Sequence, residues 1–368
     1  MTTVHLTLPC PSCSAARQKR PKVLTTQTTN TRSWRQILGA YQNPSHSRSI
    51  VEILITAGPL LAIWAAGWLA VSAGLWWLAL ILSVPAAGFL VRMFMIQHDC
   101  SHRSFFDSRA ANDWTGRIIG VLTLTPHDCW RQSHAIHHAT SGNLDRRGLG
   151  AILTLTADEY RALSPLRRLG YRLFRHPLVL FGIGPAYMFI IEQRVPTGMM
   201  REGWRPWLSA MATNAGIAAF IAAVVLLGGW QTLVFVHLPT VLLGAGVGVW
   251  LFYVQHQFEG ATWARNEQWD PTEAALLGSS HYDLPPVLAW FTANIGVHHV
   301  HHVASRIPSY RLQTVLRDHP ELRDVSRLSL TASLRCISLA LWDEAGQKLI
   351  SFRQHRKAER LRALPVAA

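Results

Sequence analysis

Four long runs without a charged residue dominate the pattern of hydrophobic and polar positions along the chain. Residues 53–71 and 75–91 form one pair and residues 207–229 and 233–254 a second, with three residues between the members of each pair. Each run approaches the roughly 20 residues that a helix needs to cross a bilayer, and each short link leaves room only for a tight reversal. The pattern predicts an all-α integral membrane protein with four transmembrane helices in two hairpins. The expected helices cover about 53–71, 75–97, 207–229 and 233–256.

Two shorter segments lie between the hairpins. In residues 165–175, Leu166, Leu169 and Leu173 fall on one helical face while most arginines lie elsewhere. This is typical of a basic amphipathic helix on a membrane surface. Residues 178–191 are apolar but number only 14, so we expect an interfacial or re-entrant segment.

Positive charge is confined to three stretches of the chain. Residues 1–50 hold seven Lys or Arg, residues 92–205 hold fifteen and residues 257–368 hold thirteen, which accounts for all 35. By the positive-inside rule, both termini and the middle segment are cytoplasmic and the hairpin links face the other side. The formal net charge of +14 then suits anionic membrane lipids, and no nucleic-acid partner is expected.

These patterns divide the chain into three parts. We expect a basic cytoplasmic N-terminal tail over 1–49, a membrane domain over 50–325 with a cytoplasmic helical cap, and a basic cytoplasmic C-terminal tail over 326–368. Because arginine heavily outnumbers lysine, a bacterial inner membrane is the expected location, with an organellar membrane as the alternative.

Histidine accounts for 18 of the 368 residues, and eight of them fall in three clusters with H-x-x-x-H or H-x-x-H-H spacing. The clustered residues are His98 and His102; His134, His137 and His138; and His298, His301 and His302. Positions i, i+3 and i+4 share a helical face, so each cluster directs two or three imidazoles the same way. One such spacing arises readily by chance, but three predict a metal site. Eight imidazoles exceed the needs of one ion and indicate two, with Fe, Zn, Cu and Ni all open.

The segments that carry these clusters resemble a known family. Gln-His-Asp-Cys at 97–100, Trp-Arg-Gln-Ser-His-Ala-Ile-His-His at 130–138 and Asn-Ile-Gly-Val-His-His-Val-His-His at 294–302 are similar to the three histidine boxes of membrane fatty acid desaturases. The resemblance covers about residues 40–320 and is strongest to bacterial acyl-lipid desaturases of the omega-6 (delta-12) type. Front-end desaturases usually have Gln as the first residue of the third box, and His298 argues against that group.

The resemblance implies a non-haem centre of two iron ions, with O2 as co-substrate and no catalytic side chain beyond the metal ligands. It also implies a further ligand near the cytoplasmic end of the last span, where His256 lies. The implied metal ligands are His98, His102, His134, His137, His138, His256, His298, His301 and His302.

Other polar residues near the clusters are expected to support the ligands, because a ligating imidazole usually donates its second N–H to a carboxylate or carbonyl. Asp99 and Asp128 lie within or just before boxes, and Glu259 follows His256 closely. Asn294, one turn before His298, would hold a water on the same face.

The remaining histidines are expected not to bind metal. His127, His237 and His281 are isolated in sequence, His299 is expected to be a supporting or surface residue, and His355 falls in the C-terminal tail.

The expected function is O2-dependent introduction of a C=C bond into a long chain of an acyl lipid or acyl thioester. No fused haem or iron–sulfur motif is found, so electrons are expected from an external ferredoxin or cytochrome b5 type carrier, and an acidic carrier would suit the positive charge. A diiron hydroxylase, carotenoid ketolase or acetylenase on the same scaffold is the alternative. A metal transporter is a remote alternative, because transport sites lie near the bilayer midplane and these clusters flank the spans.

Overall fold

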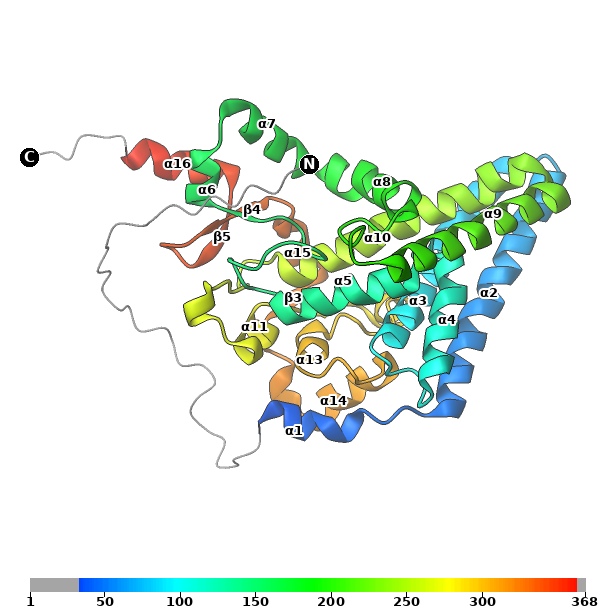
Figure 1. Ribbon diagram of the computed structural model, residues 1–368, viewed down its shortest axis with the longest axis horizontal. Coiled ribbons are helices and arrows are strands. Elements are labelled where there is room, and N and C mark those ends of the chain that lie inside the picture. The colour runs from blue at the N-terminus through cyan, green and yellow to red at the C-terminus, as the bar shows by residue number, and fades with distance from the viewer. Residues whose placement is uncertain (1–32, 363–368) are drawn as a thin grey trace, which may run out of the picture.

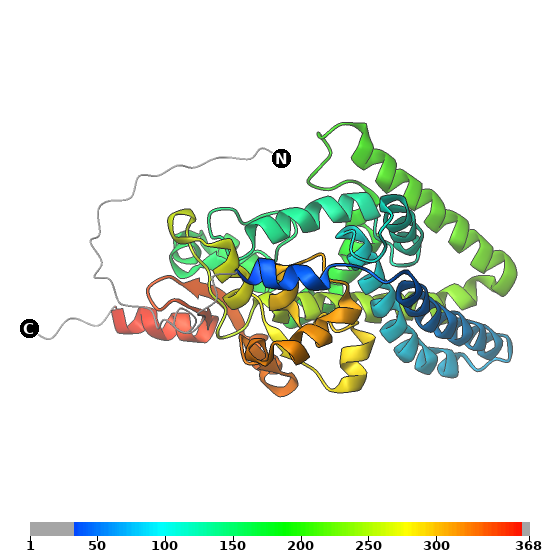
Figure 2. The same ribbon diagram turned by 90° about the horizontal axis from the view of Figure 1, so that it is seen from below.

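The computed structural model describes residues 33–362 and is mostly helical. Two long helical hairpins extend to one side, on the right in Figures 1 and 2, and shorter elements gather at their other end. The first hairpin joins α2 (His46–Ser72) to α3 (Trp76–Ser101). Gly74 in the link has a φ of +77°, a conformation that glycine adopts without a steric cost.

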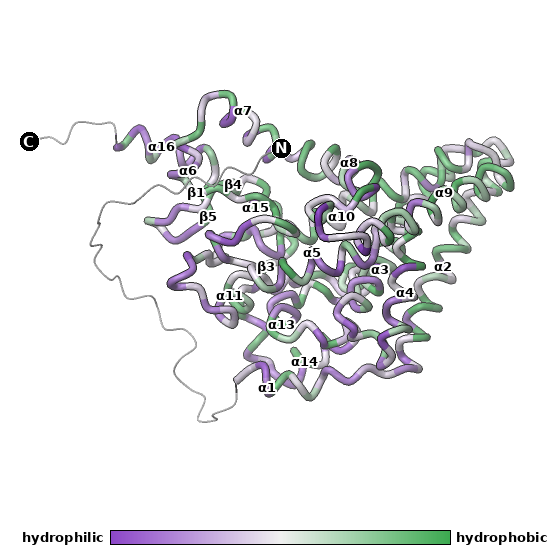
Figure 3. Tube along the Cα trace, in the orientation of Figure 1, coloured by the Kyte–Doolittle hydropathy of each residue, from purple (hydrophilic) through white to green (hydrophobic). Residues whose placement is uncertain are grey.

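The second hairpin joins α9 (Trp204–Thr232) to α10 (Leu238–His256) through a π-helical turn. The chain reverses at Gly229, whose φ is +77°. Both hairpins are long and apolar enough to cross a membrane, and hydrophobic residues predominate along their trace (Figure 3). Leu226 is 84% exposed and Leu69 is 73% exposed, which fits contact with lipid. The predicted helical membrane architecture is therefore confirmed.

A bent pair of helices follows the positions predicted for the amphipathic and short apolar segments. α7 (Pro165–Phe174) and α8 (Gly184–Ile190), with the π-helical turn before α8, form two arms at 59°. Leu166, Leu169 and Leu173 are all more than half exposed, and Tyr171 on the opposite face is buried and donates to Ala340 O at 2.6 Å. The leucines thus form an outward apolar strip.

Shorter helices form the cap at the inner end of the hairpins (Figure 1). They are α1 (Trp34–Leu38), α4 (Arg109–Leu122), α5 (His127–Thr140), α6 (Ala157–Ala162), α11 (Pro271–Leu277), α12 (Pro286–Phe291), α13 (His298–Val303) and α14 (Leu312–Asp318). α4 and α5 pack on α3 and α9, and α13 packs on α11. The cap therefore rests directly on the inner ends of both hairpins.

Residues 326–362 are folded, which differs from the tail expected there, while 363–368 and 1–32 lie outside the described residues. This region contains β3 (Arg327–Ser329), α15 (Leu330–Cys336), β4 (Leu339–Asp343), β5 (Lys348–Ser351) and α16 (Phe352–Arg362). β1 (Leu155–Thr156) pairs in parallel with β4, which pairs with β5, and β2 (His281–Asp283) pairs in parallel with β3. These short strands were not predicted and add two small sheets to the helical fold.

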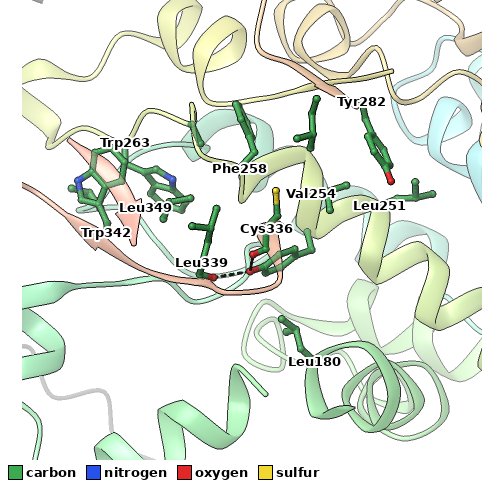
Figure 4. Packing of buried hydrophobic residues seen from close by; sticks show 14 of the residues in the cluster. Leu180, Leu251, Val254, Phe258, Trp263, Tyr282, Cys336, Leu339, Trp342 and Leu349 are labelled. Atoms are coloured by element: carbon green, nitrogen blue, oxygen red, sulfur yellow. Dashed lines mark hydrogen bonds between the residues drawn. The ribbon is translucent and has the colours of Figure 1, made fainter. Parts of the chain in front are cut away.

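The folded C-terminal region is anchored by buried apolar side chains. Trp342 is completely buried and lies beside Trp263 and Leu349, while Leu339 and Cys336 of the same cluster lie near the end of α10 (Figure 4). The hydroxyl oxygen of Tyr253 on α10 lies 2.8 and 2.7 Å from the carbonyl oxygens of Cys336 and Leu339, between which its single proton is shared. Burial of this apolar surface stabilises the region. Its many basic side chains had led to the prediction of a solvated tail.

Candidate metal centre

Two helices of the cap, α5 and α13, and the two membrane helices α3 and α10 bring nine histidines into two adjacent groups. In each group, one ring nitrogen per residue lies within 4.8 Å of the corresponding nitrogens of the others. The five-histidine group contains His98, His102, His134, His138 and His301, and the four-histidine group contains His137, His256, His298 and His302. The structure thus brings together all nine histidines named from the sequence.

Helix geometry explains how each H-x-x-H-H box serves both groups. On α5, His134 and His138 are one turn apart and enter the five-histidine group, while His137 enters the four-histidine group. On α13, His298 and His302 share a group in the same way and His301 enters the other. Successive residues on a helix differ by about 100° in direction, so positions i+3 and i+4 of each box point to different centres.

The distances within each group fit a shared cation. Six Nε2–Nε2 separations are 3.0 or 3.1 Å, and they link His102–His134, His134–His138, His138–His301, His137–His256, His256–His298 and His298–His302. Nitrogens that lie at right angles around one ion at about 2.1 Å, a usual metal–imidazole length, are about 3.0 Å apart. The buried Nε2 of His98 has no hydrogen-bond partner among the described residues, as expected of a nitrogen reserved for a metal.

Burial favours the neutral form of seven of the clustered imidazoles, the form that binds metal. It lowers the pKa of seven of these histidines well below the usual value, and neighbouring imidazoles lower it further. The seven are His102, His134, His137, His138, His298, His301 and His302. The groups thus present lone pairs near neutral pH.

Asp99 is the one expected supporting residue that meets a ligand. Its Oδ1 lies 3.3 Å from His98 Nδ1, and its Oδ2 accepts a hydrogen bond from the backbone N–H of Ser309 at 2.8 Å. Asp99 is 1% exposed. It therefore connects the first histidine box to the segment that follows the third.

Three supporting contacts were not found from the sequence. His256 Nδ1 lies 3.3 Å from Gly278 O and 3.4 Å from Ser141 Oγ, and the indole of Trp130 stacks on His134 with ring centres 4.4 Å apart. Gly278 and Ser141 are distant from His256 in sequence, so no local pattern signals them. Trp130 lies one turn before His134, and that spacing could have suggested the stacking.

The other expected supporting residues lie elsewhere. Asp128 binds Arg117 and Arg131, with Oδ2 2.9 Å from Arg117 Nε. Glu259 is exposed, and Asn294 is half-buried in a left-handed turn with a φ of +60°. None of the three shows a hydrogen bond to a clustered histidine within residues 33–362.

The isolated histidines lie outside both groups, as expected, although several are buried. His299 is completely buried with its Nε2 2.9 Å from Leu322 O, which excludes the surface position considered for it. His281 Nδ1 lies 2.6 Å from Arg323 O, and His237 accepts a hydrogen bond from Trp68. His355, expected in a solvated tail, is buried against Tyr160 because α16 is folded.

Comparisons with known proteins agree with this geometry. The family model described as fatty acid desaturase matches residues 75–332. A fatty acid desaturase of Bacillus subtilis (strain 168) is 42% identical over 316 residues, which are 86% of this chain and 89% of that protein.

More distant relatives carry more specific names. The sn-1 oleoyl-lipid 12-desaturase of Arthrospira platensis is 26% identical over 67% of this chain and 70% of its own length. The sn-1 acyl-lipid omega-3 desaturase (ferredoxin) of Synechocystis sp. is 26% identical over 73% of this chain and 74% of its own length. With the family model covering most of the chain and both histidine groups assembled, the chain belongs to the fatty acid desaturases, a family of membrane oxidoreductases.

Proposed function

We propose that the two histidine groups hold two iron ions and that the chain introduces a C=C bond into a long acyl chain with O2 as oxidant. The convergence of nine imidazole nitrogens on two points carries this proposal. Zinc would bind such ligands but is redox-inert. Bound iron supplies the O2 chemistry: two hydrogens leave neighbouring carbons, and two external electrons and two protons complete the reduction of O2 to two waters.

The side chains of this protein position and protect that centre. Neutral Nε2 atoms hold the ions, while Asp99 orients His98 through Nδ1 and Gly278 O does the same for His256. Trp130 covers one face of His134, and packing of this kind around the ligands favours a single ligand geometry. No side chain is required as a nucleophile.

The substrate is proposed to be an acyl lipid or acyl thioester of the membrane. The two groups lie where the hairpins meet the cap, so an acyl chain in the apolar layer would reach them from one side. The names of two distant relatives specify acyl lipids, which favours that carrier.

Electrons are proposed to come from a separate ferredoxin or cytochrome b5 type carrier on the positively charged side. We place that side and both termini in the cytoplasm, at a bacterial inner membrane, because all 35 basic residues lie outside the hairpin links and cytoplasmic segments carry the excess of positive charge. An acidic carrier steered by this charge would reduce the enzyme more slowly as salt increases. A rate independent of salt would contradict electrostatic docking.

The decisive experiment combines metal analysis with product mass. Protein purified with iron is reconstituted in lipid with a reductase, a ferredoxin and defined acyl lipids, and products are analysed by mass spectrometry. We expect two irons per chain and a product lighter by two hydrogens. A product heavier by one oxygen would show hydroxylation, and zinc as the only bound metal would overturn the redox mechanism.

A further inference from the structure

A buried ion pair lies inside the first hairpin, apart from both histidine groups. Glu52 of α2 and Arg92 of α3 are each 4% exposed, and Arg92 Nη2 donates to the Glu52 carboxylate. Arg48, one turn before Glu52, lies 2.7 Å from the other carboxylate oxygen. Charged side chains within membrane helices are costly and usually serve function, and a buried ion pair is weak evidence for added stability. The pair therefore calls for a role beyond joining two neighbouring helices.

Arg92 reaches beyond Glu52 to the last turn of α12. Its Nη1 donates to the backbone carbonyl of Trp290, and its guanidinium lies over the Trp290 indole, 4.1 Å from the ring centre. Its Nε donates to Thr56 Oγ1 at 3.1 Å. All three nitrogens of the planar guanidinium are thus engaged, which a lysine could not reproduce.

The Trp290 carbonyl is also the base of a strained turn that leads into the third histidine box. Ala293 donates its N–H to Trp290 O at 3.0 Å. Ala293 and Asn294 have φ values of +48° and +60°, the left-handed region that is uncommon for residues other than glycine. Such a backbone persists where its surroundings hold it in place. His298 begins α13 four residues after Asn294.

We propose that Arg92, oriented by Glu52, is a positioning residue for His298 and His302. Arg92 holds the Trp290 carbonyl in place, and this carbonyl accepts the hydrogen bond of the turn at Ala293. The position of that turn determines where α13 begins and therefore where His298 and His302 lie. The inference rests on the proposed binding of two irons. The four-histidine group takes two of its four ligands from α13, whereas the five-histidine group takes one of five. Loss of Arg92 therefore affects mainly the iron in the four-histidine group.

Two variants separate positioning from stability. Arg92→Met leaves the buried charge of Glu52 with Arg48 as its partner, whose side chain is half exposed. Glu52→Gln with Arg92→Met removes both buried charges, which is far less damaging to a fold. We expect the single variant to unfold at a lower temperature and bind one iron per chain. The double variant should recover most of the unfolding temperature yet still bind one iron, because the tie to Trp290 is lost in both.

Leu341→Ala is the control for general destabilisation, because Leu341 is completely buried in the C-terminal sheet, far in sequence from α12. It should unfold at a lower temperature and retain two irons. Two irons in the double variant would overturn the positioning role of Arg92, as would an iron loss in Leu341→Ala that matches its loss of stability. Wild-type protein with fewer than two irons would instead contradict the proposed function.

Discussion

Two kinds of buried histidine occur in this molecule, and burial does not distinguish them. The clustered histidines direct their Nε2 atoms at one another at 3.0 to 3.1 Å. By contrast, His299 and His281 each place a ring nitrogen on a backbone carbonyl, at Leu322 and Arg323. Burial lowers the pKa of both kinds, and that of His299 falls to about 3. Convergence of several nitrogens therefore marks a metal ligand, whereas burial and a lowered pKa do not.

His298 and His299 give the sharpest test of this comparison, because they are adjacent on one helix and point in different directions. His298→Ala should reduce desaturation to below about 1% of wild type and lower the iron content from two to one per chain. His299→Ala removes a buried ring and leaves Leu322 O unpaired, which costs about 2 to 4 kcal/mol of stability. It should still retain two irons.

The measurements are iron per chain, product formation and thermal unfolding on the same reconstituted samples. Equal loss of iron in His298→Ala and His299→Ala would break the distinction between the two kinds of histidine. It would show that the third box acts through its packing as a whole.

The same contrast explains which parts of the site were predictable. Spacings of i, i+3 and i+4 are local, so the eight box histidines were identified from sequence, and His256 followed from the resemblance to desaturases. The division of each box between two groups depends on where other helices lie and was not predicted. Asp99 and Asp128 looked equivalent in sequence, yet Asp128 binds Arg117 because arginines from α4 and α5 surround it.

The fold shows a similar limit. The hairpins were predictable because an uncharged run of about 20 residues has few alternatives in lipid. The C-terminal region was not, since its strands are short and β4 pairs with β1, which lies more than 180 residues earlier in the chain. Its buried anchor, Trp342, ends a short apolar run over 336–342 that is far below the length of a membrane span. The charged composition of the C-terminal region therefore predicted its solvent-exposed side chains but not its buried core.

His127 is a buried histidine outside both metal groups, and the pH dependence of folding stability tests whether it is neutral in the folded protein. Its ring packs against Gly116, and neither ring nitrogen meets a hydrogen-bond partner in the described part of the chain. Burial lowers its pKa to about 4, although the nearby carboxylate of Asp128 opposes the shift. In the unfolded chain the pKa of His127 is about 6.5, so the unfolded state binds a proton more readily than the folded state. The folded protein therefore has its full stability above pH 6.5 and loses stability as the pH falls towards 4. At pH 5 the loss is about 2 kcal/mol.

The variant His127→Leu removes this titration while filling much of the same space. Its free energy of unfolding should therefore fall less between pH 7 and pH 5 than that of wild type, measured by denaturant unfolding of the metal-free protein. An unchanged difference between the two pH values would show that His127 binds its proton equally well in the folded state. Two irons per chain in the loaded variant would separate this histidine from the ligands.

Substitution of His237 has the smallest expected effect. This histidine binds no metal in the proposal and makes a single hydrogen bond between the two hairpins. Its Nε2 accepts from Trp68 Nε1 at 3.0 Å, and the Trp64 ring lies edge-on at 4.6 Å. His237→Leu leaves the Trp68 N–H unpaired and should cost about 1 kcal/mol, a usual value for one hydrogen bond between membrane helices. His237→Gln offers an acceptor again and should recover part of this lost stability.

Both variants should keep two irons and full activity in reconstituted samples, since the bond joins α2 to the start of α10 at the end of the helix opposite His256. Loss of iron in His237→Leu but not in His237→Gln would mean that the contact between the hairpins controls the metal groups at a distance, and the two kinds of histidine would then be coupled.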